Sequence, residues 1–279
     1  MSGRRIALVL AFANYRTAPP LPTGIADTRA LQRALADPQI GRFDRVDAQF
    51  DLPRALVQEH VQAFLAAGQK DDLVLLYIAG HMGLDTTGRF TIAAANAEDM
   101  QGTNSIDGAW LEEHLNRCVS KRVVLILDGR NSGAFGESIR ARTGFDVSTT
   151  RDLAGPERVV LASAGISDLA DTQVSKGDTP ASFTDIVVRG ITGGAADIDG
   201  DGTVNVFELF EYAQKESARY FAARQRPLLR MFGGAPASII IAYTTHEHNQ
   251  QTSLGTAGLP DDLLSAVEST SITARQQAF

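Results

Sequence analysis

The stretch "VVLILDGRNSGAF" (residues 123–135) joins an apolar run to a glycine-bounded polar turn. Five apolar residues, Val123 to Leu127, are followed by Asp128 and then by the turn from Gly129 to Gly133. A continuous apolar run of this length is typical of a strand that is buried on both faces of a parallel sheet. Because ligands bind beyond the carboxyl ends of such strands, this turn is a candidate for the functional site.

Similar apolar runs alternate with helical patterns along the chain. The predicted buried strands cover residues 5–12, 72–80, 122–129, 158–165 and 237–243, and a more alternating run over 45–52 indicates an edge strand. Helical spacing covers residues 24–37, 53–68 and 105–118, with Asp107 as a plausible cap of the last helix. This order predicts a three-layer α/β fold with a mainly parallel central sheet and helices on both faces.

Composition excludes several classes of protein. The chain has 279 residues, enough for one large domain or two small ones, and its net charge of −7 argues against nucleic-acid binding. No apolar run reaches the ~18–20 residues that a membrane span needs. The single cysteine, Cys118, excludes disulfides within the chain and favours a reducing compartment, so we predict a cytoplasmic protein.

Two polar turns follow neighbouring predicted strands, and neither decides a function by itself. The first contains His81 between Gly80 and Gly83, and a lone histidine at a strand end is more often structural than catalytic. The second contains Ser132, which is followed directly by Gly133 and therefore does not fit the G-x-S-x-G pattern of a nucleophilic serine.

Taken together, the two turns resemble those of the caspase and metacaspase family of cysteine peptidases. "YIAGHMG" (77–83) is similar to the strand end that carries the family's catalytic histidine, and "LILDGRNSGAFGES" (125–138) to the one that carries its cysteine. Further similar segments, "IALVLAFANYRTAPPLPTGIADTRAL" (6–31), "RVVLASAG" (158–165), "TPASFTDIVVRGI" (179–191) and "QRPLLR" (225–230), come in the family's order. The resemblance implies a caspase-like fold over residues 1–243 and His81 as a catalytic residue.

The resemblance also places Arg130 at the position of the nucleophilic cysteine. The family mechanism needs a thiolate activated by the histidine, and a guanidinium has no lone pair available for attack. Met82 stands where glycine is usual, Asn131 differs from the usual histidine or arginine, and Ile166 and Ser167 replace an expected acidic pair. These departures predict an inactive pseudo-peptidase.

Two other interpretations of the chain stay open at this point. The first is an endopeptidase whose nucleophile at position 130 was mutated, which a cysteine codon in the natural gene would reveal. The second is a calcium-dependent structural module. The predicted partner is a protein, whether bound or cleaved, and the resemblance to bacterial sequences implies a role in signalling or defence.

The segment "DIDGDGTVNVFE" (197–208) has the spacing of an EF-hand calcium loop. Asp197, Asp199, Asp201, the Thr203 carbonyl and Glu208 would supply oxygen ligands, which are the ligands that Ca²⁺ prefers. The alternative is a solvated Asp-Gly turn that begins a helix. We predict Ca²⁺ binding here.

The pattern of strands and helices fades after about Tyr243. Residues 244–258 are polar and are predicted to be a linker. An apolar helical pattern then starts over residues 259–279 and stops at Phe279, which predicts the start of a helical segment of a longer polypeptide.

Overall fold

The fold is built on a six-stranded sheet with the strand order β10-β8-β7-β3-β1-β2. The computed structural model describes residues 3–21, 24–98, 104–129, 132, 134, 157–163, 182–221, 226–232 and 238–244. Five strands of the sheet run parallel: β1 (Arg5–Ala11), β2 (Arg45–Phe50), β3 (Leu73–Ala79), β7 (Arg122–Asp128) and β8 (Glu157–Ala162). The sixth, β10 (Leu228–Phe232), is antiparallel to β8 and forms one edge.

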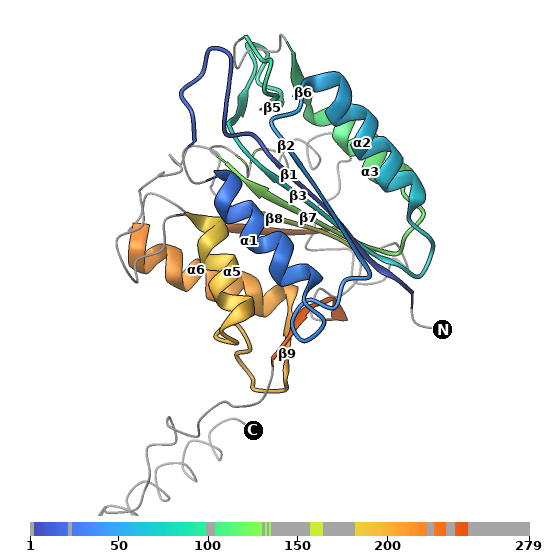
Figure 1. Ribbon diagram of the computed structural model, residues 1–279, viewed down its shortest axis with the longest axis vertical. Helices are drawn as coiled ribbons and strands as arrows, with labels where there is room; N and C mark the ends of the chain where they lie inside the picture. The colour runs from blue at the N-terminus through green and yellow to red at the C-terminus, as the bar shows by residue number, and fades with distance from the viewer. Residues whose placement is uncertain are drawn as a thin grey trace, which may run out of the picture. The chain divides into compact units, whose positions relative to one another are not determined.

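Helices cover both faces of this sheet (Figure 1). One face carries α1 (Gly24–Ala36), α5 (Phe183–Thr192) and α6 (Val206–Phe221), and the other carries α2 (Arg54–Ala67) and α3 (Gly108–Arg117). Alternate residues of β3 enter the two cores: Leu75 and Tyr77 pack on the α1 side, and Leu76 and Ile78 pack on the α2 side. The predicted three-layer α/β fold with a mainly parallel sheet is therefore confirmed.

We expected residues 237–243 to form a strand of the central sheet, and this expectation was wrong. Residues 237–243 contain β11 (Ile240–Tyr243), which lies outside the central sheet and pairs with β9 (Thr203–Asn205). Val204 of β9 is fully buried, and a short isolated strand needs a partner for its backbone groups. An apolar run alone could not distinguish this partner from the central sheet.

A second sheet, of three short strands, follows the turn at His81. It has the order β4-β5-β6 and consists of β4 (Met82–Leu84), β5 (Phe90–Ala93) and β6 (Ser105–Asp107). The helix predicted over 105–118 begins only at Gly108, because residues 105–107 pair with β5. Asp107 is still its N-cap and accepts a hydrogen bond from the Ala109 N–H at 2.6 Å.

Contacts within the chain separate one compact unit, Met1–Thr245, from residues 246–279. The helical segment predicted over 259–279 and all of the linker after Thr244 lie outside the described residues and stay predictions. In the described part of the chain, no helix combines the length and the apolar character that crossing a membrane requires.

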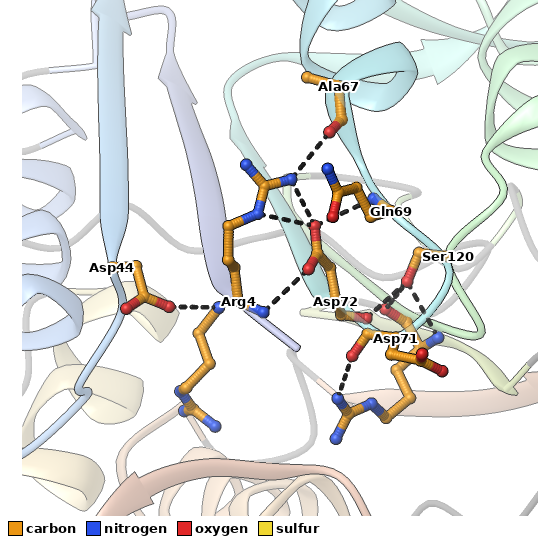
Figure 2. Close-up of polar contacts among 9 residues, drawn as sticks. Arg4, Asp44, Ala67, Gln69, Asp71, Asp72 and Ser120 are labelled. Carbon is orange, nitrogen blue, oxygen red and sulfur yellow. Dashed lines mark hydrogen bonds and ion pairs between the residues drawn. The ribbon is translucent and has the colours of Figure 1, made fainter. Parts of the chain in front are cut away.

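A buried carboxylate, Asp72, ties the amino ends of the strands together (Figure 2). It accepts hydrogen bonds from the backbone N–H of Arg4 at 2.8 Å, from the Arg4 guanidinium at 2.6 Å and from the Gln69 N–H at 2.9 Å. The Ser120 hydroxyl, two residues before β7, donates to the Asp72 carbonyl at 2.6 Å. Burial by itself raises the pKa of Asp72, but the hydrogen bonds from Arg4 and Gln69 outweigh it, and the pKa is lowered overall.

We expect Asp72→Asn to lower the free energy of unfolding by about 2 kcal/mol at pH 7, since hydrogen bonds to an ionised group are lost. A carboxyl whose pKa is lowered by folding stabilises the protein above its unfolded pKa, 3.8, and this stabilisation is lost as the pH falls through the folded value. The difference from wild type in urea titrations should therefore shrink below about pH 4. Asp71→Asn is the control, because Asp71 is exposed and its ion pair with Lys121 should contribute less than about 0.5 kcal/mol. Equal losses for both variants would contradict the prediction.

Candidate functional site

The two polar turns begin side by side at the carboxyl ends of β3 and β7. Ala79 is paired with Asp128, and the Gly80 N–H donates to the Asp128 carbonyl at 3.0 Å. The turns are so close that a Cβ added at Gly129 would lie 2.3 Å from the Gly80 carbonyl oxygen and 2.8 Å from Met82 Cγ. Arg130 lies outside the described residues, so its predicted position beside His81 stays a prediction.

His81 is held at three points. Its Nε2 atom lies 2.8 Å from the Pro19 carbonyl oxygen, its backbone N–H donates to the Tyr15 hydroxyl at 2.8 Å, and its ring lies 4.6 Å from the Tyr15 ring. A carbonyl oxygen only accepts hydrogen bonds, so the neutral imidazole carries its proton on Nε2. Nδ1 is then the acceptor, as a general base requires.

Tyr15 links the turn at His81 to the chain segment that follows β1. Its hydroxyl donates to the Phe12 carbonyl at 2.8 Å while it accepts from the His81 N–H. Burial raises the pKa of Tyr15, so the hydroxyl stays protonated and can keep donating at any working pH. A side chain at Gly80 would be blocked, because an added Cβ would lie 2.7 Å from the Tyr15 hydroxyl oxygen. Glycine before His81 is thus required by this close approach.

Asp128 places a half-buried carboxylate at the start of the second turn. The Thr184 hydroxyl donates to it at 2.5 Å, and the Tyr77 hydroxyl, which also contacts Thr184, lies 3.4 Å away. The pKa of Asp128 is raised, mainly by burial. The nearby charge of Asp27 raises it further, and the hydrogen bond from Thr184 opposes the rise. Two neighbouring carboxylates favour the approach of a cationic group.

Cys118 lies far from the two turns. It follows the end of α3 and precedes β7, at the amino end of the sheet, and its side chain is buried. The turns of His81 and Gly129 lie at the carboxyl end of the same sheet. The sequence contains no other cysteine.

The acidic loop connects α5 to α6 and brings three of its predicted ligands together. Carboxylate oxygens of Asp197, Asp199 and Glu208 lie within 4.8 Å of one another. Asp201 instead accepts hydrogen bonds from the backbone and hydroxyl of Thr203, at 2.8 and 2.7 Å. The set contains only oxygen donors, which fits a hard cation such as Ca²⁺.

Hydrogen bonds within the loop also hold its carboxylates in place. The buried Glu208 accepts from the N–H groups of Ile198 and Asn205, both at 3.0 Å, and Asp197 accepts from Gly200 and Gly202 at 2.9 and 3.1 Å. Both glycines have positive φ, 75° and 89°, which the sharp turn requires.

Sequence patterns gave no indication of the Pro19 carbonyl. It contacts His81 through backbone atoms, which any residue would supply, so no side chain marks the position. Tyr15 belongs to the segment 6–31 that contributes to the family resemblance, but its contact with His81 follows only from the fold.

Comparisons with known proteins show similarity in structure only. No family model matches the sequence, and no curated protein matches it. Among solved structures, protein GSU0716 from Geobacter sulfurreducens matches with a TM-score of 0.60 and 17% identity, over 87% of this chain and 100% of that one.

Caspase-1 from Spodoptera frugiperda matches with a TM-score of 0.55 and 10% identity, over 89% of this chain and 92% of that one. Identities this low carry no conclusion about activity. The likeness covers the six-stranded, mostly parallel sheet and its helices, and the chain therefore has a caspase-like fold.

Proposed function

We propose that this chain is a caspase-like domain without peptidase activity, which acts as a regulatory or interaction module in bacterial signalling or defence. The observation that carries the proposal is Arg130, two residues after the end of β7. Attack on a peptide carbonyl needs a thiolate or an activated hydroxyl, and an arginine supplies neither. The lone thiol, Cys118, is buried at the opposite end of the sheet.

The preserved geometry around the site supports a role in binding a protein partner. His81 is held by Pro19 and Tyr15, and Asp128 offers a carboxylate at the same sheet end. An extended segment with a basic side chain would fit this charge. We place this role in the cytoplasm, where a single reduced cysteine is usual.

Labelling with a peptidyl electrophile tests the proposal without depending on turnover. The folded wild-type protein should form no adduct by mass spectrometry, whereas Arg130→Cys should react at residue 130, and faster with an Arg-terminated probe than with an Asp-terminated one. His81→Ala in the Arg130→Cys background should slow the labelling, because the base is lost. An adduct on the folded wild-type chain that depends on His81 would overturn the proposal.

We also propose that the loop 197–208 binds Ca²⁺ through Asp197, Asp199, Asp201, Thr203 and Glu208. The convergence of Asp197, Asp199 and Glu208 supports this proposal. The pairing of β9 with β11 supports it further, since it holds the second half of the loop in an extended form. Asp201 would have to release Thr203 to reach the ion.

Calcium at 100 times its dissociation constant should stabilise the folded protein by about 2.7 kcal/mol, because the ion binds only the folded loop. We expect thermal melts in excess Ca²⁺ and in chelator to differ, and the difference to vanish in Glu208→Gln. Glu211→Gln is the matched control, because Glu211 is exposed on α6 just beyond the loop. This variant should keep the difference between melts in Ca²⁺ and in chelator. Identical wild-type melts and no heat of binding would reduce the loop to a structural turn.

A further inference from the structure

Asp51 directly follows β2, and β1 separates that strand from β3, the strand that ends shortly before His81. It is one of a few described residues other than glycine with a positive φ, 50°, a conformation that aspartate and asparagine tolerate better than most residues. Its own N–H donates to the Ala11 carbonyl at 2.9 Å, at the last residue of β1. The strained backbone thus points the Asp51 carboxylate at the chain that leaves β1.

The carboxylate of Asp51 fastens that chain by three hydrogen bonds. One oxygen accepts from the N–H groups of Ala13 and Asn14 at 2.7 and 3.0 Å, and the other accepts from the Asn14 side-chain amide at 2.6 Å. Hydrogen bonds to an ionised acceptor are about twice as strong as neutral ones. The first two residues after the buried end of β1 are therefore fixed.

The loop held in this way, residues 13–21, carries both groups that contact His81. Tyr15 follows Asn14 directly, and the N–H of Leu21 donates back to the Ala13 carbonyl at 2.9 Å, which closes the loop and brings Pro19 over the imidazole. Thr17 anchors the outer part of the loop by donating to the Glu98 carbonyl at 2.7 Å. Asp51 is thus attached at the base of the loop, and Pro19 and Tyr15 lie further along it.

We infer that Asp51 is the positioning residue for His81: it sets the orientation and the tautomer of the imidazole through the loop of residues 13–21. Without the carboxylate, Ala13 and Asn14 lose their acceptor, and the Pro19 carbonyl is no longer held over Nε2. The inference concerns the geometry of His81 and holds whether or not position 130 supports chemistry.

The test uses the ring nitrogens of His81 as a readout, by long-range ¹H–¹⁵N spectra of the full chain in alkaline solution. Wild type should show the tautomer protonated on Nε2 and an Nε2–H that exchanges slowly with water. In Asp51→Ala this exchange should be faster by about tenfold or more, since the acceptor of all three hydrogen bonds is lost. Asp44→Ala removes a carboxylate that accepts one backbone N–H, from Arg5, at the far end of the sheet, and should change nothing at His81.

A reciprocal exchange separates positioning from general damage to the fold. In the double variant Asn14→Asp with Asp51→Asn, the residue 51 amide oxygen still accepts from the two backbone N–H groups, and its NH₂ donates to the new carboxylate. All three hydrogen bonds are thereby kept, and the wild-type His81 spectrum should return. A folded Asp51→Ala protein with a wild-type His81 spectrum would overturn the inference, as would a folded double variant whose His81 spectrum differs from that of wild type. If Asp51→Ala does not fold, Asn14→Ala, which removes one of the three bonds, should give a smaller change of the same kind, and an unchanged spectrum would overturn the inference.

Discussion

Gly129→Ala is expected to destabilise the protein by about 3 kcal/mol or more. The added Cβ would lie 2.3 Å from the Gly80 carbonyl oxygen, and this oxygen belongs to the backbone of a buried strand end that cannot rotate away. Relief requires the turns after β3 and β7 to separate, which would break the hydrogen bonds between Gly80 and Asp128 and between Gly129 and Ser163. The midpoint of thermal unfolding should fall by roughly 10 °C.

Gly24→Ala is the matched control for this substitution. Gly24 begins α1, and a Cβ there would meet only the side chains of Ala13 and Leu21, both at 3.8 Å. Alanine is favoured over glycine in a helix, so this variant should be as stable as wild type or slightly more stable. If Gly129→Ala unfolds at the same temperature as Gly24→Ala, Gly129 does not lie against the Gly80 carbonyl oxygen, and the prediction is wrong.

Arg130→Cys is expected to give the chain a thiol-dependent peptidase activity that wild type lacks. Two features of the described residues support this expectation: the Pro19 carbonyl oxygen lies 2.8 Å from His81 Nε2, and Asp128, two residues before position 130, accepts a hydrogen bond from the N–H of Gly80, the neighbour of His81. Removing the nucleophile of a hydrolase with a comparable pair of groups costs on the order of 10⁶ in rate, so even a poorly aligned thiol should exceed the wild-type background by several orders of magnitude.

The controls for this gain are Arg130→Ala and the double variant of Arg130→Cys with His81→Ala. Both should stay at the background rate, the first because no nucleophile is present and the second because the base is lost. Absence of activity in a folded Arg130→Cys protein would mean that the site has lost more than its nucleophile, for which Met82 and Asn131 are the first candidates.

The sequence was sufficient to predict the central sheet because its strands are continuous apolar runs, buried on both faces, with helices between them. It was not sufficient where tertiary pairing overrides the local pattern. Ser105 and Ile106 fit the start of a helix, yet they pair with β5, and Ile240 and Ile241 fit a central strand, yet their segment pairs with the acidic loop. In both cases the choice depends on which backbone groups need a partner.

The candidate site also has a part that the sequence predicts and a part that only the fold reveals. The spacing of Asp197, Asp199 and Glu208 predicted their convergence, because all three lie within one loop of fixed geometry. The contacts of His81 join residues that are more than 60 positions apart, and one of them, from Pro19, involves only a backbone carbonyl. Asp51 is harder still to predict, since its link to His81 runs through three hydrogen bonds and a loop.

The central claim, that this caspase-like domain does not cleave peptides, is tested most directly by turnover of fluorogenic peptides. Arg-, Lys- and Asp-terminated substrates are incubated with wild type and with His81→Ala, side by side, with and without Ca²⁺. We predict the same rate for both proteins under all conditions, equal to that of buffer alone. Turnover by the wild-type chain that His81→Ala abolishes would contradict the claim and show that the site works without a cysteine at position 130.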